Sequence, residues 1–292
     1  MSPFRRLLVH VTDNDLDEAL VRFAARLAAQ HDAGLQALHA VEPFSLGAYL
    51  SPEAAMTAAE VNQQLVRERS ARARERVHRA SQAAGRAVDF RVPGGDPLQA
   101  LMAHTRTSDL ALVIAPGARD DDALTPGFAS QLVVGTGCPV MFVPKAALEA
   151  ACGTRILVAW SDTRESARAL RDALPLLRRA KAVEVLRFGL ERAERPDGAE
   201  PMDAVAGYLD AHGVKAQFAA RALRDLPFAE RMLVPNAVDA SIAELLLSHA
   251  ADTSADLIVM GGYGHPRAYE FVLGGVTRTM LASMTVPVLM SH

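Results

Sequence analysis

The segment MGGYGHPRAYEFVLGGVTRTML contains five glycines in two groups. Gly261, Gly262 and Gly264 form the first group, and Gly274 and Gly275 follow after a spacer of nine residues behind Gly264. Glycine accepts a positive φ and lets backbone N–H groups approach a ligand closely. Two structures therefore fit the segment. One is a cradle for phosphate groups, and the other is a turn that leads into a closely packed helix.

The residues around these glycines supply candidate donors. A helix is expected to start at Gly274 and to run to about Ser283, and the free N–H groups at a helix N-terminus bind anions. The donors in its first turn would be the backbone of Gly275 and Val276 and the hydroxyl of Thr277. In the loop between the two groups, His265 and Arg267 are the cations that could reach a phosphate.

Other kinds of site are not supported by the sequence. The segment has no Gly-Lys-Ser/Thr triplet, and its glycine spacing is not that of the dinucleotide fingerprint. The nine histidines show no metal-ligand spacing, and no Ser-His-Asp or Cys-His arrangement is visible. We therefore expect no catalytic or metal-binding residues, and at most a slow ATPase.

The elements that must position these residues occur twice along the chain. Asp13 aligns with Asp162 at an offset of 149 residues, and Asp109 aligns with Asp256 at an offset of 147. A nearly constant offset between landmarks indicates an internal duplication. We predict two domains, residues 1–148 and residues 153–292.

Each predicted domain alternates strands with helices. Several strands are continuous apolar runs, which suit a parallel sheet that is covered on both faces. The predicted strands are Leu7–Val11, Gly34–Val41, Ala87–Val92, Leu110–Ile114, Val140–Val143, Ile156–Trp160, Ala182–Arg187, Lys215–Arg221, Leu257–Met260 and Val286–Met290. The fold class is therefore α/β, with two tandem doubly wound domains, each a five-stranded parallel sheet flanked by helices.

Ligands of such sheets bind beyond the carboxyl ends of the strands, near the point where the strand order reverses. In the second domain, two segments meet this edge. One is the turn Ser161-Asp162-Thr163, and the other is the glycine segment that begins after Met260. Asp162 could contact a ligand or cap the following helix, and Thr163 could also act as the cap.

Composition limits the class of protein and its expected location in the cell. The formal charge is −3, which does not indicate a nucleic-acid surface, and the basic run at residues 66–80 is interpreted as a solvated helix face. Two cysteines are too few for a disulfide framework. No signal-type segment or apolar stretch of membrane-spanning length is present. A cytoplasmic location is expected.

Residues 261–290, together with ILVAWSDTRESARALRDALPLL and VPGGDPLQALMAHT, resemble domains of the universal stress protein family. Nucleotide-binding members of that family carry Gly-x2-Gly-x9-Gly, and Gly261, Gly264 and Gly274 have this spacing. The resemblance covers nearly the whole chain as a tandem pair. It implies an adenine nucleotide such as ATP, with Mg²⁺, in the second domain, and an internal pseudo-dimer joined through the last strands.

Some positions depart from the family pattern. Gly275 stands where the family has Ser or Thr, and Ser161 stands where ATP-binding members have Asp, with Asp162 one position later. In the first domain Ile114 replaces the first glycine, Phe128 follows the last glycine, and three aspartates (120–122) lie between the two glycines that remain. We expect the first domain to be degenerate and not to bind ATP.

The resemblance implies action in the stress response or its regulation through a protein partner, with further homodimerisation open. Two alternatives remain at this point. The chain could be a nucleotide-free interaction module, or a weak enzyme that hydrolyses ATP or transfers adenylyl groups. The stretches Gly189–Gly213 and Leu223–Ala237 could form a lid, a partner surface or an ordinary packed loop.

Overall fold

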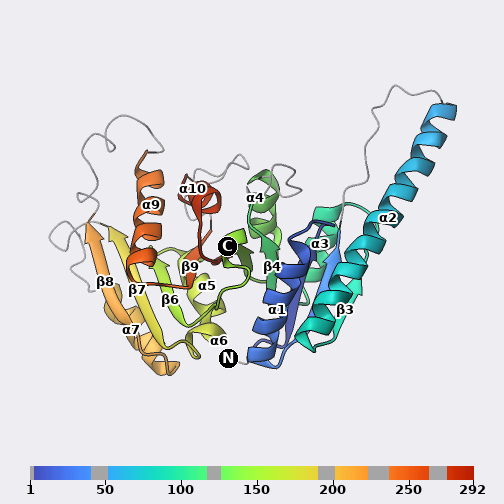
Figure 1. Ribbon diagram of the computed structural model, residues 1–292. Helices are drawn as coiled ribbons and strands as arrows, with labels where there is room; N and C mark the ends of the chain where they lie inside the picture. The colour runs from blue at the N-terminus through green and yellow to red at the C-terminus, as the bar shows by residue number, and fades with distance from the viewer. Residues whose placement is uncertain (1–2, 41–51, 117–125, 190–200, 223–236, 263–274) are drawn as a thin grey trace. The chain divides into compact units, whose positions relative to one another are not determined.

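A computed structural model gives the structure of the chain, and it describes residues 3–40, 52–116, 126–189, 201–222, 237–262 and 275–292. Phe4–Val113 forms one compact unit, and Ile114–His292 belongs to a second. Helices and strands alternate along both units (Figure 1). The predicted α/β class is confirmed, because each half of the sequence contributes five strands to a mostly parallel arrangement flanked by helices.

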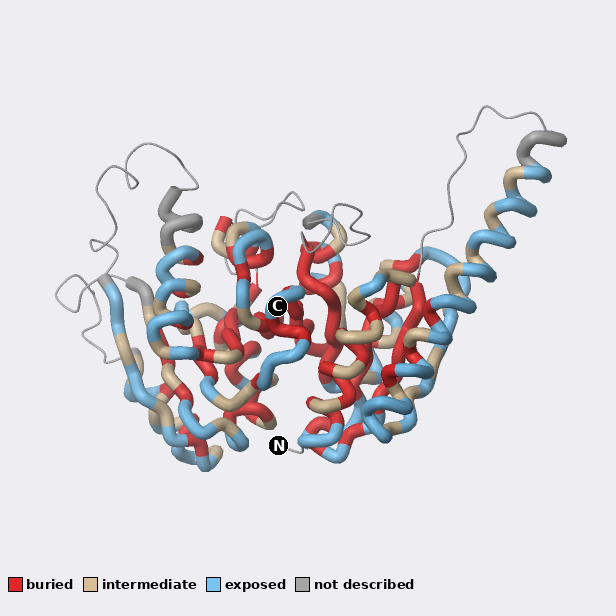
Figure 2. Tube along the Cα trace, in the orientation of Figure 1, coloured by how far each residue is buried: buried red, intermediate tan, exposed pale blue. Residues whose placement is uncertain are grey.

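The first unit contains four parallel strands in the order β3-β2-β1-β4. Its elements are β1 (Arg6–Val11), α1 (Asp17–His31), β2 (Gly34–His39), α2 (Pro52–Ala84), β3 (Val88–Arg91), α3 (Pro97–Thr105) and β4 (Leu110–Ile114). The central strands β1 and β4 are buried along almost their whole length, whereas the edge strand β3 alternates between half-buried and exposed residues. Figure 2 shows the same contrast between the buried strands and the exposed outer side of α2.

The second unit contains six strands in the order β5-β10-β9-β6-β7-β8. Its strands are β5 (Val140–Val143), β6 (Arg155–Trp160), β7 (Ala182–Gly189), β8 (Gln217–Ala222), β9 (Leu257–Gly261) and β10 (Val288–Ser291). Its helices are α4 (Pro126–Gly135), the 3₁₀ turn Lys145–Ala147, α5 (Arg164–Asp172), α6 (Leu174–Leu177), α7 (Pro201–Ala211), α9 (Ala237–Asp252) and α10 (Gly275–Ser283). All neighbouring strands are parallel except β5 and β10, which pair antiparallel.

The duplication seen in the sequence has a physical counterpart at the start of each first strand. The carboxylate of Asp109 accepts N–H bonds from Arg5 and Arg6 at 2.7 and 2.9 Å. Asp256, at the equivalent position, accepts N–H bonds at 2.9–3.0 Å from the three residues 153–155. Each aspartate thus satisfies backbone donors that precede or begin a first strand, which explains why both copies have Asp at this position.

The predicted strands agree with the structure to within two residues, and β4 and β5 have the predicted bounds. The stretch Gly189–Gly213 contains the helix α7. The candidate lid at Leu223–Ala237 lies almost wholly outside the described residues. None of the described helices is long and apolar enough to cross a membrane.

Candidate functional site

The turn after β6 places two of the predicted ligand residues at the carboxyl edge of the second unit's sheet. Asp162 takes a left-handed conformation with φ 55°, and Asp13, its counterpart after β1, takes one with φ 69°. Few residues other than glycine adopt this conformation, and Asp is among those that tolerate it. The shared backbone geometry shows that the two turns are the same structural feature.

Asp162 does not cap the helix that follows. Thr163 is the N-cap of α5, because its hydroxyl accepts the N–H of Ser166 at 3.2 Å, and the Ser166 hydroxyl accepts the N–H of Thr163 at 3.1 Å. This reciprocal pair satisfies two donors at the helix start. The interpretation of Asp162 as a cap is therefore wrong, and Thr163 is the cap. The hydroxyl of Ser161 lies 3.2 Å from that of Thr163.

The side chain of Asp162 instead joins the ends of two neighbouring strands. Its Oδ1 accepts the indole N–H of Trp160 at 2.5 Å, and its Oδ2 accepts an N–H from Nη2 of Arg187 at 2.5 Å. Trp160 ends β6, and Arg187 lies opposite it on β7 in the parallel register. The sequence interpretation missed Arg187, although its position near the end of a predicted strand placed it at the ligand edge.

On β9, Met260 and Gly261 occupy the next strand along this edge. Met260 is buried and lies opposite Ala159 of β6, so its side chain belongs to the core. A Cβ atom on Gly261 would lie 2.6 Å from the backbone nitrogen of Ser166 and 2.7 Å from the carbonyl carbon of Glu165. Gly261 is therefore required by the close approach of β9 to the first turn of α5.

This packing corrects one part of the phosphate interpretation. Gly261 does not take a positive φ, and it continues the strand instead of turning its backbone toward a ligand. Gly262 is also confined, because a Cβ there would lie 2.8 Å from a methyl group of Val133. Both glycines thus have a packing reason that is independent of any ligand.

The second glycine group leads into α10, which begins at Gly275, one residue after the predicted start. Gly275 and Thr277 are buried, and Val276 is half-buried. The first N–H groups of this helix have no partner within the helix itself, as at any helix N-terminus. Gly264, His265, Arg267 and Gly274 lie outside the described residues.

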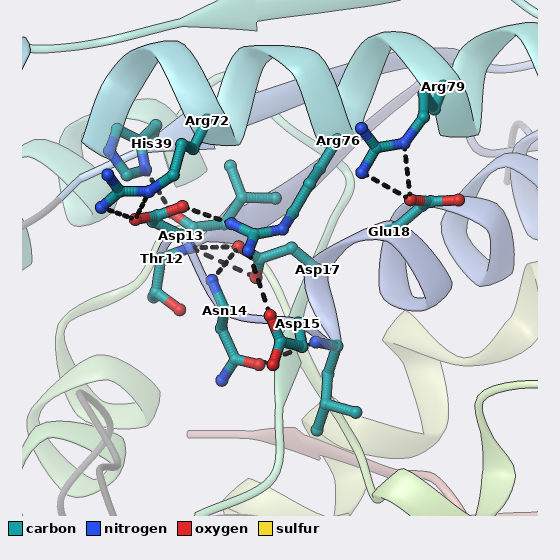
Figure 3. Close-up of polar contacts among 12 residues, drawn as sticks. Thr12, Asp13, Asn14, Asp15, Asp17, Glu18, His39, Arg72, Arg76 and Arg79 are labelled. Carbon is teal, nitrogen blue, oxygen red and sulfur yellow. Dashed lines mark hydrogen bonds and ion pairs between the residues drawn. The ribbon is translucent and has the colours of Figure 1, made fainter. Parts of the chain in front are cut away.

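The corresponding edge of the first unit has a different structure, which Figure 3 shows. Asp13 is held by two arginines of α2: the Nη2 of Arg72 lies 2.6 Å from its Oδ2, and Arg76 bonds its Oδ1. Arg76 also pairs with Asp15 at 3.0 Å, and Arg79 pairs with Glu18 at 3.1 Å. The basic run of α2 is thus an electrostatic attachment to the turn after β1, not only a solvated face.

A second carboxylate completes the first unit's turn. Asp17, in the first turn of α1, accepts N–H bonds from Thr12 at 3.1 Å and from Asn14 at 2.7 Å. Burial raises the pKa of Asp17 from its usual 3.8 to about 6. Leu16 is the N-cap of α1 and provides no side-chain bond. Asp17 therefore organises this turn from inside the helix.

The two histidines in the first unit's strands are buried and hydrogen-bonded. His10 bonds the carbonyl of Ala40 at 3.0 Å, and His39 bonds the carbonyl of Val11 at 3.0 Å. Burial lowers the pKa of His10 from 6.5 to about 4. His39 is the counterpart of Arg187 at an offset of 148 residues, so the two halves place different chemistry beside the equivalent aspartates.

The accessibility of the two aspartates differs strongly. The side chain of Asp162 is 39% exposed, whereas that of Asp13 is 5% exposed beneath the arginines of α2. The three aspartates at 120–122 lie outside the described residues, and Phe128 is half-buried in α4. No group of three or more potential metal ligands occurs within the part of the chain that the structure describes.

Comparison with known proteins agrees with this architecture. The model of the universal stress protein family matches residues 3–144 and again residues 154–292. A universal stress protein of Archaeoglobus fulgidus DSM 4304 has a similar structure, with a TM-score of 0.65, 14% identity, and 98% of this chain and 95% of that chain covered. A proposed universal stress protein of Pseudomonas aeruginosa UCBPP-PA14 has a TM-score of 0.58, 16% identity, and 99% and 93% coverage.

A search of curated proteins finds no match. At such low identities the two structures establish a shared fold, and the family match establishes membership, because it spans almost the whole chain in two copies. The chain therefore belongs to the universal stress protein family and contains that family's unit twice.

Proposed function

We propose that the second half of this chain binds ATP or a related adenine nucleotide, and that the first half does not. The observation that carries the proposal is the contrast between the two equivalent aspartates. Asp162 is 39% exposed at the carboxyl edge of its sheet, whereas Asp13 is 5% exposed under Arg72 and Arg76. A ligand can reach the carboxylate of Asp162 without displacing a helix, and it cannot reach that of Asp13.

Two groups of residues in the second unit fit the two ends of a nucleotide, the base and the phosphates. The base would lie beside Ser161 and Asp162, where the strand order reverses at β6 between β7 and β9. The phosphates would meet the free N–H groups at the start of α10, from Gly275 to Thr277. Gly264, His265 and Gly274 belong to the same proposed phosphate segment, and bound Mg²⁺ would neutralise phosphate charge.

The expected role is regulatory rather than catalytic. Nucleotide binding would shift a conformational or oligomeric equilibrium, and a cytoplasmic protein partner would respond to that shift in the stress response. The antiparallel pairing of β5 with β10 supports the expected association of the last strands of the two halves.

A nucleotide-free interaction module is the second candidate, and one observation favours it. Gly261 and Gly262 are both required by packing against α5 and α4, so the first glycine group does not by itself indicate a ligand. A purely structural role for the glycines predicts a protein whose stability does not respond to nucleotide.

The only tryptophan of the chain, Trp160, allows a direct test because its indole is bonded to Asp162. We expect Mg-ATP to change the emission of Trp160 in a saturable way, with free tryptophan as the control for light absorption by the nucleotide. The melting temperature should also rise, since ligand at a hundred times its Kd stabilises by about 2.7 kcal/mol. Unchanged emission and unchanged melting at millimolar Mg-ATP would favour the nucleotide-free module.

A further inference from the structure

Arg187 is the charged residue that the structure adds to the proposed base end of the site. It lies near the carboxyl end of β7, opposite Trp160 in the register of β6 with β7, and its Nη2 donates to Oδ2 of Asp162 at 2.5 Å. Its side chain is 15% exposed. Its Nε atom is buried and has no hydrogen-bond partner within the described part of the chain. Because this Nε is not accessible, the donors that remain for a ligand are the terminal N–H groups of the guanidinium.

The chemistry of the pair is complementary. A guanidinium has five N–H donors in one plane and no acceptor, whereas an ionised carboxylate only accepts. Asp162 and Arg187 therefore present an acceptor and donors side by side at the ligand edge. An amide side chain presents the same two groups when it reads adenine, accepting from the 6-amino group and donating to the neighbouring ring nitrogen N7.

We propose that Asp162 and Arg187 act together as a base-reading pair that selects adenine over guanine, with Arg187 as a specificity-determining residue. The inference rests on the proposed nucleotide function. Asp162 accepts from the 6-amino group of adenine, and Arg187 donates to a ring nitrogen. Guanine has a carbonyl oxygen at position 6, which would face the carboxylate of Asp162 without a proton between them.

Asp162 and Arg187 determine the base preference jointly. An arginine alone prefers guanine, because its donors match the O6 and N7 acceptors of that base. The ion pair with Asp162 holds the guanidinium of Arg187 in place and puts a negative charge beside it. Removal of the aspartate should therefore reverse the preference, not merely weaken binding.

The test compares the affinities of Mg-ATP and Mg-GTP for the full chain and its variants. We expect the wild type to prefer ATP by a factor on the order of tenfold to a hundredfold, the range for one bidentate base contact. Asp162→Ala should shift the preference toward GTP. Arg187→Leu should weaken ATP binding by removing the donor to the ring nitrogen, while Asp162 still disfavours the 6-carbonyl of GTP, and the double variant should show no preference.

Two further variants guard against a structural explanation. Arg187→Lys keeps a positive charge for Asp162 but lacks the planar fork, so it should fold as the wild type does and still weaken ATP binding. Arg155→Leu, at the opposite end of β6, should change neither the affinity nor the selectivity. Melting temperatures confirm that each variant is folded.

The outcomes separate this inference from the function on which it rests. Selectivity that follows the variants as described supports the pair. Wild-type binding of ATP with an affinity that is unchanged in Arg187→Leu, or no shift toward GTP in Asp162→Ala, overturns the base-reading role and leaves the nucleotide function standing. Binding of neither nucleotide to the wild type overturns both.

Discussion

Trp160 donates its indole N–H to Oδ1 of Asp162 at 2.5 Å, across the turn that ends β6. Asp162 takes a left-handed conformation there, and its other oxygen holds Arg187 of β7. The turn therefore links two adjacent strand ends through one carboxylate. In the first unit, the equivalent Asp13 binds arginines of a helix instead, and this difference separates an accessible edge from a covered one.

The close approach of β9 to α5 predicts that Gly261→Ala is destabilising. The added Cβ would lie 2.6–2.7 Å from backbone atoms of Ser166 and Glu165, which cannot rotate away as a side chain could. We expect a loss of about 1–3 kcal/mol in the free energy of unfolding, measured by urea titration. Gly207→Ala in α7 is the matched control, because nothing lies within 4 Å of its Cβ position and alanine favours helix by about 0.5–1 kcal/mol. Equal effects of the two substitutions would contradict the packing account.

The attachment of α2 to the turn after β1 predicts unequal roles for its arginines. Arg76→Ala leaves the buried carboxylate of Asp13 with Arg72 as its remaining arginine and should cost about 1–3 kcal/mol. Arg79→Ala breaks a pair in which the arginine is 50% exposed, and it should cost less than about 1 kcal/mol. Urea midpoints of the two variants decide the matter, and a larger effect of Arg79→Ala would show that Asp13 is not the centre of the attachment.

The buried titratable groups of the first unit predict two opposite pH effects. The pKa of His10 is lowered to about 4, so its contribution to stability is present above pH 6.5 and is lost as the pH falls toward 4. The pKa of Asp17 is raised to about 6, so its contribution is present below pH 3.8 and is lost as the pH rises through 6. Each shift corresponds to about 3 kcal/mol, and the two oppose each other between pH 4 and 6.

Substitution of either group should therefore change how the free energy of unfolding depends on pH. Compared with the wild type, His10→Gln is expected to require relatively more urea at pH 4 and relatively less at pH 6, because the substitution removes the His10 effect that favours the higher pH. Asp17→Asn is expected to show the reverse. Profiles of the two variants that run parallel to each other between pH 4 and 6 would refute this assignment of the titrating groups.

The strands could be predicted from sequence because buried strands consist of local runs of apolar residues. LALVI and VMFV are apolar throughout, and they form β4 and β5 with the predicted bounds. The duplication was visible because both copies need an aspartate at positions 109 and 256 to bind backbone N–H groups.

The side-chain pairs at the two edges could not be predicted in the same way. Asp13 lies 59 residues from Arg72, and Asp162 lies 25 residues from Arg187, so neither pair leaves a local pattern. The role of Gly261 also depends on a distant element, since the clash that excludes a Cβ involves α5. The sequence therefore located the turn at Ser161–Thr163 but left its cap open between Asp162 and Thr163, and it did not point to the arginine that holds Asp162.

The central claim is that one half of this tandem chain binds an adenine nucleotide while α2 covers the equivalent edge of the other half. Isothermal titration calorimetry of the full chain with Mg-ATP tests this claim most directly through its stoichiometry. We expect one nucleotide per chain, with weaker binding in Asp162→Ala and unchanged stoichiometry in Arg79→Ala. Two equivalent nucleotides per chain, or no binding at millimolar Mg-ATP, would contradict it.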